Sequence, residues 1–346
     1  MTIRKQVKRF WKMFESERAN LEKAFLEHNH EEITEINKIL ATYFEELCNC
    51  QIDISEEDGI FEFTMLPEMD KNAQIICALT KKMAPTSMQD WVIHSCLPPL
   101  TQKALNTVLR LENDEYTCND FKVYYEVDKE SHCLNVNLYC PAFAHLEPNK
   151  ALEIGYYMTE LFIGEAALEG YINHVDVIDQ QPLEGKGVLL PYFYELLLDI
   201  VEDEKWSQYD DPTSIYRVYQ INEDKLSDEV RKDMKVIFTI HPSLLEEMLN
   251  DNYHLASEFL DFGGEYGYLY YPHENSEVND SLMRQTLEKN LNELLYPMGF
   301  ARSIGGAIGT KYAYIDLAVF DKEDFIKALE KINAKLKTKL QYVSFE

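Results

Sequence analysis

The segment FKVYYEVDKESHCLNVNLYC, residues 121–140, indicates the fold of this chain more clearly than any other stretch. Apolar and polar side chains alternate in two runs, which is the pattern of strands with one buried face. The polar residues DKESH (128–132) separate the two runs and are typical of a tight turn. The sequence therefore predicts a β-hairpin whose buried face carries Phe121, Val123, Tyr125 and Val127 on one strand and Leu134, Val136 and Leu138 on the other.

Helical and strand patterns extend outward from this hairpin in both directions. Apolar residues at three- and four-residue steps predict helices over 3–25, 33–47, 150–162, 192–203 and 322–336. Alternation of apolar and polar residues predicts further strands at 59–66, 171–178, 235–241 and 311–320. We therefore predict an α+β fold of two α/β-sandwich modules, in which mainly antiparallel sheets carry helices packed on one face.

The length of the chain favours two domains, because 346 residues are about twice the common domain size. The segment QQPLEGKGVLLP (180–191) gathers polar, glycine and proline residues and is the best boundary candidate. We predict an N-terminal α+β domain over 1–182 and a C-terminal α+β domain over 190–346. No residue-level repeat connects the halves, and a diverged duplication stays an open alternative.

The charge balance excludes some classes of partner. The chain has 61 acidic and 33 basic residues, and its formal net charge is −28. A field of this sign repels phosphate backbones and anionic lipid, so we expect no nucleic-acid and no membrane partner. The same negative field attracts cationic surfaces, so we expect that a partner would be a basic protein. A surface that is acidic only for solubility is the alternative reading of the same charge.

The N-terminal stretch MTIRKQVKRFWKMFESERANLEK is basic but lacks the apolar core and small-residue cleavage site of a signal peptide. No stretch of the sequence approaches the roughly 18 to 20 apolar residues of a membrane span. We therefore expect a cytoplasmic protein.

The cysteine pattern favours reduced, mostly buried thiols, because their number is odd and most lie in apolar or aromatic stretches. Cys48 and Cys50 form C-x-C, and no matching pair lies at zinc-site spacing. The segment EHNHEE (27–32) offers His28 and His30, which chelate together only if the segment is a loop. We expect a surface loop there, and no metal ion and no cofactor. The seven cysteines are Cys48, Cys50, Cys77, Cys96, Cys118, Cys133 and Cys140.

Familiar catalytic signatures, such as the P-loop, G-x-S-x-G and H-E-x-x-H, do not occur in the sequence. The glycine-rich segment ARSIGGAIGTKY (301–312) is one candidate binding loop, with Gly305, Gly306 and Gly309 available to cradle a phosphate near Lys311. A strand follows this segment, whereas phosphate loops lead into a helix. A hairpin or bulge that requires glycine dihedrals is the alternative.

Two further candidates rest on single side chains. Glu165, beside Gly164 at the end of a predicted helix, could act as a base, with Glu169 or Asp176 as its partner. A structural role in the turn is the alternative. Trp91, Tyr268 and Tyr270 would form protein-recognition anchors if they were exposed, and burial against the helices is the alternative.

Some of these residues resemble the N-terminal module of a bacterial protein family that is frequent in Bacteroidetes-type genomes. The resemblance covers roughly residues 7–180. It implies a division between this module and a variable second module, and it implies no activity. The motifs are F-W-x-x-F (Phe10, Trp11, Phe14), AP…W (Ala84, Pro85, Trp91) and I-G-E (Ile163, Gly164, Glu165).

Together these observations favour a non-catalytic, acidic protein-binding module, for example one that neutralises a basic toxin or nuclease by mimicking its nucleic-acid ligand. The alternative from another class is a hydrolase or transferase, or a small-ligand sensor, with its site in an interdomain cleft and Glu165 as a functional carboxylate.

Overall fold

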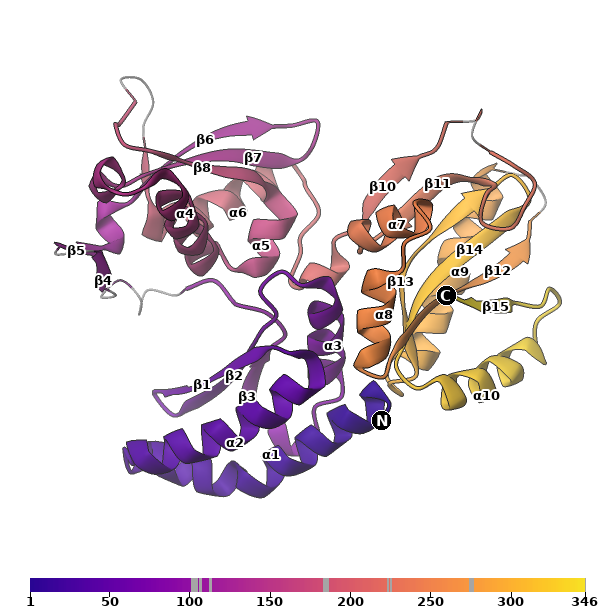
Figure 1. Cartoon of the computed structure of the whole chain (residues 1–346), viewed down its shortest axis with the longest axis horizontal. Coiled ribbons are helices and arrows are strands. Elements are labelled where there is room, and N and C mark those ends of the chain that lie inside the picture. The colour runs from indigo at the N-terminus through magenta and orange to yellow at the C-terminus, as the bar shows by residue number, and fades with distance from the viewer. Residues whose placement is uncertain are drawn as a thin grey trace. The chain divides into compact units, whose positions relative to one another are not determined.

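The fold class predicted from the sequence is confirmed. The computed structural model describes residues 1–100, 105, 108–111, 114–182, 187–222, 224, 226–273 and 277–345, with backbone only for residues 111, 114 and 277–280. Within these residues the chain forms ten α-helices and fifteen strands, and most neighbouring strands are antiparallel (Figure 1). This is an α+β protein.

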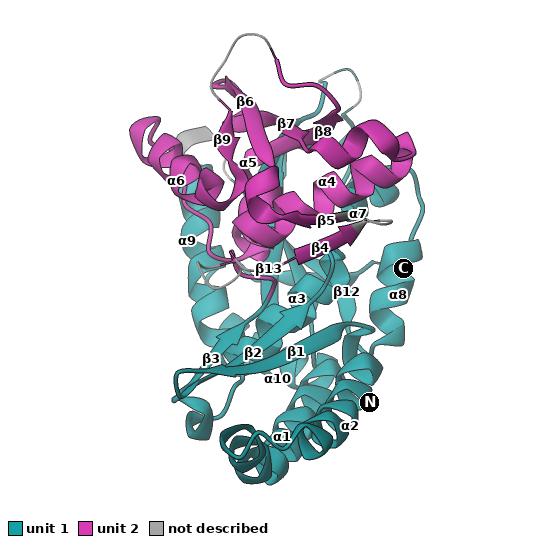
Figure 2. Cartoon of the chain, turned by 90° about the vertical axis from the view of Figure 1, so that its left-hand side faces the viewer, with its two compact units in different colours: residues 1–95, 216–346 teal, residues 96–215 magenta. Residues whose placement is uncertain are grey.

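The chain divides into two compact units, but not where the sequence suggested. Unit 1 combines Met1–Ser95 with Tyr216–Glu346, and unit 2 is the continuous stretch Cys96–Ile215 inserted between them (Figure 2). The predicted division into 1–182 and 190–346 is therefore corrected. The segment 180–191 is a connection inside unit 2, because the residues that follow it form a strand of the unit 2 sheet and a helix of its core. Residues 183–186 of this segment lie outside the described residues.

The first part of unit 1 is a three-stranded sheet covered by helices. Strand β2 pairs antiparallel with β1 and, after the crossover through α3, parallel with β3. Asn29 and Asp70 begin α2 and α3, because each side chain accepts a hydrogen bond from a backbone N–H of the first turn. The elements are α1 (Ile3–Leu26), α2 (His30–Cys48), β1 (Gln51–Glu57), β2 (Ile60–Leu66), α3 (Lys71–Lys82) and β3 (Trp91–His94).

The second part of unit 1 is a six-stranded antiparallel sheet in the order β10-β11-β13-β14-β12-β15. Helices α9 and α10 cover one face, where Leu291 and Phe325 pack against Ile315 of β14. The elements are β10 (Arg217–Gln220), β11 (Met234–Thr239), α7 (Pro242–Leu249), α8 (His254–Asp261), β12 (Glu265–Pro272), α9 (Glu277–Leu295), β13 (Ala301–Gly309), β14 (Tyr312–Val319), α10 (Lys322–Asn333) and β15 (Gln341–Ser344).

One hydrophobic core joins the two parts of unit 1. Phe10, Phe14 and Phe63 of the first part belong to the same buried cluster as Phe259 and Tyr266 of the second. Such non-directional apolar burial is the dominant stabilising term of folding, so residues 216–346 are required to complete the core that residues 1–95 begin.

A buried polar contact crosses the same junction inside unit 1. The Tyr266 hydroxyl donates to Asn72 Oδ1 at 2.6 Å, and Asn72 Nδ2 donates to the Leu255 carbonyl at 3.1 Å. Asn72 lies on α3, whereas both of its partners lie on the second part. Because buried polar groups need partners, this network fixes how the two parts meet.

Unit 2 is a four-stranded sheet with helices on one face, and it contains the predicted hairpin. Strands β6 and β7 pair with Val123 opposite Leu138 and Tyr125 opposite Val136, so the predicted apolar face is confirmed. Helices α4, α5 and α6 pack on this face, and Asn135 and Asn137 point from β7 to the other. The four-stranded sheet has the order β8-β7-β6-β9, with β8 parallel to β7.

The remaining strands of unit 2, β4 and β5, form a separate antiparallel pair. The elements of unit 2 are β4 (Val108–Leu111), β5 (Asp114–Thr117), β6 (Lys122–Asp128), β7 (Cys133–Tyr139), α4 (Pro148–Ile163), α5 (Glu165–Tyr171), β8 (Ile172–Ile178), β9 (Val188–Leu189) and α6 (Phe193–Asp203).

Candidate functional site

The glycines of the segment 301–312 lie in strand β13, where the chain forms a bulge. This is the alternative that the sequence offered to a phosphate loop. The register of β13 against β14 shifts between Ser303 and Gly305. Gly305 and Gly306 have φ of 152° and 155°, a region that residues with a Cβ rarely adopt. A Cβ on Gly305 would lie 2.1 Å from the Phe238 carbonyl oxygen of neighbouring β11. The glycines thus serve close backbone packing in the sheet.

Gly309, the third predicted glycine, makes room for a buried carboxylate. A Cβ at this position would lie 2.2 Å from Asp233 Oδ2. This carboxylate accepts the backbone N–H groups of Lys311 and Tyr312 at 2.8 and 3.0 Å and the hydroxyl of Tyr314. Asp233 therefore takes the acceptor role at the β13–β14 turn, while Lys311 Nζ lies 2.7 Å from Asp228 instead of facing a phosphate site.

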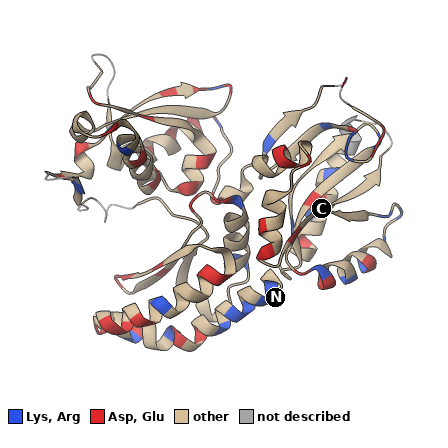
Figure 3. Ribbon diagram, viewed as in Figure 1, with Lys and Arg blue, Asp and Glu red and all other residues tan. Residues whose placement is uncertain are grey.

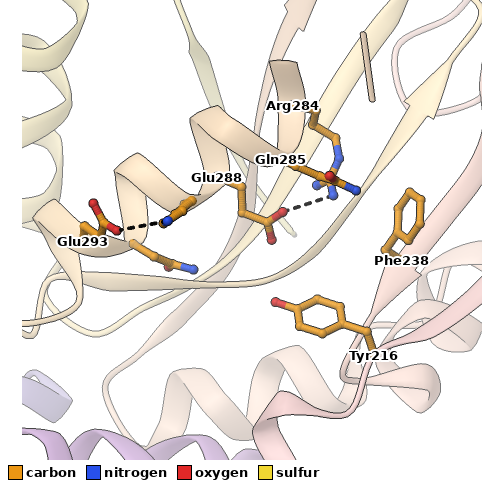
Figure 4. A pocket seen from close by; sticks show the side chains of 8 residues that line it. Tyr216, Phe238, Arg284, Gln285, Glu288 and Glu293 are labelled. Carbon is orange, nitrogen blue, oxygen red and sulfur yellow. Dashed lines mark ion pairs between the residues drawn. The ribbon is translucent and has the colours of Figure 1, made fainter. Parts of the chain in front are cut away.

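A groove of about 500 Å³ opens beside the same sheet (Figure 4). One wall is the side of α9 that carries Arg284, Glu288 and Asn292. The other wall is formed by Phe238 of β11 and by Tyr216, which precedes β10. No sequence pattern indicated this groove. The lining residues are Tyr216, Phe238, Arg284, Gln285, Glu288, Lys289, Asn292 and Glu293.

Arg284 is the unusual residue of this groove, because its side chain is only 3% exposed. Its Nη2 lies 3.0 Å from Glu288 Oε2, and its guanidinium carbon lies 5.1 Å from the ring centre of Phe238. Within the part of the chain that the structure describes, Nε and Nη1 have no hydrogen-bond partner. Nη1 would lie 2.7 Å from a Cβ on Gly306, so this glycine admits the guanidinium. Buried, unpaired N–H donors favour an oxygen acceptor as ligand.

The predicted aromatic anchors lie against other side chains instead of forming an exposed ladder. Tyr268 is 8% exposed and stacks on Phe345 with 5.4 Å between ring centres. Tyr270 is half-buried, and its hydroxyl donates to Gln341. Trp91 is buried, and its indole N–H donates to Glu22 Oε1 at 2.9 Å. Burial against neighbouring elements, the alternative reading, describes Tyr268 and Trp91.

Glu165 is the first residue of α5 and belongs to unit 2, as do its suggested partners Glu169 and Asp176, whereas the glycine, tyrosine and tryptophan candidates belong to unit 1. It is 1% exposed, and its backbone N–H donates to the Leu97 carbonyl at 3.0 Å. Gly164 before it has φ 80° and turns the chain between α4 and α5. This position fits the structural alternative, because a general base must reach its substrate.

Three cysteine sulfurs converge in the first part of unit 1, an arrangement that sequence spacing missed. The Sγ atoms of Cys48, Cys50 and Cys77 all lie within 4.8 Å of one another, and all three residues are buried. Cys48 ends α2, and Asn49 takes the left-handed conformation with φ 54°, which turns Cys50 back toward it. Cys77 comes from the buried side of α3. In the described residues no other group of three or more His, Cys, Asp or Glu side chains converges this way, so His28 and His30 form none.

The environment of the three thiols differs between them. Hydrogen bonds from the Cys48 and Cys77 thiols lower the pKa of Cys50 to about 5. Burial raises the pKa of Cys48 and of Cys77 well above the ordinary thiol value. Cys50 is therefore the most readily ionised thiol of the three.

The acidic charge of the chain is concentrated in unit 2. Residues 96–215 contain 22 acidic and 7 basic residues, a net charge of −15 in about a third of the chain. On helix α6, Glu195, Asp199, Glu202 and Asp203 are exposed. The ribbon of unit 2 carries few Lys and Arg positions (Figure 3). None of these four carboxylates has a cationic partner among the residues described, so the face stays uncompensated. We call these four residues with exposed Tyr192 the acidic face of α6.

In the described residues, no helix combines the length and the apolar character needed to cross a bilayer. No protein-family model, no curated protein and no solved structure matches the chain, and the resemblance in residues 7–180 therefore stays a prediction.

Proposed function

We propose that this protein is a non-catalytic binding module whose partner is a basic protein, and that unit 2 carries the interface. The observation that supports this most is the net charge of −15 on residues 96–215 together with the uncompensated acidic face of α6. A partner that normally binds nucleic acid, such as a basic nuclease or toxin, presents the complementary charge pattern.

The negative charge of unit 2 first raises the rate at which the protein and a basic partner meet. Fields of this size steer a cationic partner over about a Debye length, ~8 to 10 Å at ordinary ionic strength. Glu195, Asp199 and Glu202 follow one another at three- and four-residue steps, so they share one side of α6. Exposed ion pairs contribute only ~0 to 1 kcal/mol each, so the carboxylates act as a set and no single one decides binding.

Exposed aromatic rings on α4 and at the start of α6 supply the apolar contacts that charge alone cannot give. Tyr192 is 57% exposed at the start of α6, and α4, which packs against α6, leaves Tyr157 56% exposed. Tyrosine is enriched among residues that dominate protein interfaces. These tyrosines take the anchoring role that the sequence had assigned to Tyr268 and Tyr270.

The test begins with affinity capture from a lysate of the source organism at low and high salt, and mass spectrometry identifies the captured protein. The dissociation constant is then measured for the purified partner and the full chain. A triple variant of α6 (Glu195→Gln, Asp199→Asn, Glu202→Gln) should bind about 5- to 30-fold more weakly and show a shallower salt dependence.

A matched control separates a defined interface from general charge. The triple variant Glu35→Gln, Glu45→Gln and Glu46→Gln removes the same charge from exposed positions of α2 in unit 1 and should leave the affinity within about twofold. Equal weakening by both triple variants, an acidic or nucleic-acid partner, or binding that is indifferent to salt would each contradict the proposal.

Small-ligand binding is the second candidate, and Arg284 is the observation that favours it. The groove of about 500 Å³ is large enough for a metabolite, and the unpaired Nε and Nη1 of Arg284 favour a carboxylate or phosphate. A thermal-shift screen with small carboxylates and phosphate esters tests it. A hit should be lost in Arg284→Met and kept in Lys327→Met, which removes an exposed cation from α10. A screen without a hit, or a hit that both variants keep, would reject this candidate.

A further inference from the structure

The cluster of Cys48, Cys50 and Cys77 has the geometry of a metal site. Metal–sulfur bonds near 2.3 Å place three sulfurs in one plane about 4 Å apart. The three Sγ atoms already lie within 4.8 Å of one another, so each must move by less than about 1 Å to share one ion. A disulfide needs only two of them, and the convergence of the third is what points to an ion.

Separate elements of the core position the three cysteines, so the cluster is preformed. The left-handed Asn49 places Cys48 and Cys50 together at the junction of α2 and β1, and α3 delivers Cys77 from the other side. All three belong to the hydrophobic core of unit 1, which contains Phe44 and Leu47. Rigid core elements orient ligands more accurately than loops do.

The number of ligands selects the ion. Cysteine sulfur is a soft ligand that favours Cu(I), zinc and iron–sulfur clusters. A structural zinc site closes with four ligands, and iron–sulfur clusters are likewise held by four cysteines. Within the described residues the cluster has three members and no fourth His, Cys, Asp or Glu side chain, and it is buried away from a solvent ligand. Cu(I) is stable with three sulfur ligands and needs no fourth.

We propose that Cys48, Cys50 and Cys77 bind one Cu(I) ion through three sulfur atoms. Each thiol that coordinates releases its proton to solvent, so the ion replaces protons and no electron is transferred. Cys50 is 7% exposed, more than Cys48 or Cys77, so the ion would reach the cluster past Cys50. This replaces the expectation of no metal ion, which rested on sequence spacing alone and overlooked Cys77, 27 residues after Cys50.

The experiment titrates Cu(I) into the reduced full chain under anaerobic conditions against a chromophoric Cu(I) chelator. We expect one equivalent to bind, and X-ray absorption at the copper edge should show three sulfur neighbours and no nitrogen or oxygen. Cys77→Ala should weaken binding at least about tenfold and leave two sulfur neighbours, since even residues that only orient metal ligands typically contribute 10- to 100-fold.

The control is Cys140→Ala, which removes an equally buried cysteine from the unit 2 core and should bind copper like the wild type. The absorption spectrum of the wild type tests the proposal even if Cys77→Ala fails to fold. Failure to bind one equivalent, oxygen or nitrogen in the first shell, equal affinity in Cys77→Ala, or binding of zinc in preference to Cu(I) would each overturn the proposal. None of these outcomes bears on the acidic face of α6, which belongs to unit 2.

Discussion

Acid should destabilise unit 1 through a single buried histidine, His241. Its Nδ1 accepts the N–H of Leu244 at 3.3 Å and so caps α7, which leaves the proton on Nε2, 3.4 Å from Asn72 Oδ1. Burial, and to a lesser extent the charge of Lys71, lowers the pKa of His241 from its ordinary value near 6.5 to about 3. The folded protein therefore keeps this ring neutral where the unfolded chain protonates it.

Proton linkage gives the direction and the magnitude of the change in unfolding free energy with pH. Below pH 6.5 the unfolded state binds more protons than the folded state, so stability falls as pH decreases from about 6.5 toward about 3. Between pH 7.5 and pH 5.0 a histidine with these two pKa values costs about 2 kcal/mol of unfolding free energy. This magnitude changes little as long as the folded-state pKa stays below pH 5, because the unfolded-state titration sets it.

The assay is urea unfolding at pH 7.5 and pH 5.0, followed by tryptophan fluorescence. Trp11 and Trp91 belong to unit 1 and Trp206 to unit 2, so a Trp206→Phe background makes the signal report unit 1. The comparison is with His241→Asn, whose side chain retains an acceptor for the α7 cap but cannot be protonated in this range.

The wild type should lose about 2 kcal/mol more than His241→Asn between the two pH values. The other histidines contribute equally to both proteins, so the difference isolates position 241. Losses that agree within about 0.5 kcal/mol would show that the folded state protonates His241 normally, and the reasoning from its burial would then be wrong.

Three further outcomes test the packing of each unit. Asp233→Ala leaves two backbone N–H groups and the Tyr314 hydroxyl without their acceptor, and it should cost about 3 kcal/mol or more in urea unfolding; a loss under 1 kcal/mol would contradict that role. Gly306→Ala places a Cβ 2.2 Å from the Tyr314 carbonyl oxygen and should lower the melting temperature by at least about 5 °C, whereas an unchanged value would show that β13 shifts freely. Proteolysis between residues 180 and 191 should leave two fragments that elute together in native gel filtration, because β9 pairs with β6 and α6 belongs to the unit 2 core; separate elution would support the original division of the chain.

Local structure could be predicted where a pattern repeats along the sequence. The alternation of residues 121–140 gave the strands, the turn and the buried face of the hairpin, because these depend only on neighbours in the chain. The domain division could not be predicted in this way. A cluster of polar, glycine and proline residues marks an exposed connection, and an exposed connection occurs inside a domain as readily as between two.

The candidate sites show the same limit for pairs that are distant in sequence. Cys77 joins the C-x-C pair only because α3 packs beside the end of α2, and no spacing rule connects them. The groove likewise depends on Gly306 in β13 admitting Arg284 from α9. A glycine in a strand indicates only that another group approaches the backbone closely, so it could not identify Arg284 or predict the groove.

The discontinuity of unit 1 has a consequence for the order of events on the ribosome. Unit 2 is continuous and can fold once residue 215 has emerged, whereas residues 1–95 must wait for the strands and helices of residues 216–346 to complete their core. At about 5 to 20 residues per second, the remaining 251 residues take about 13 to 50 s to synthesise. During that interval Ile3 lacks its hydrogen bond to the Gly263 carbonyl, and the buried Asn72 lacks its partners Tyr266 and Leu255. Residues 1–95 thus complete their packing only after unit 2, although they precede it in the chain, and their unfinished surface stays available to a chaperone for longer.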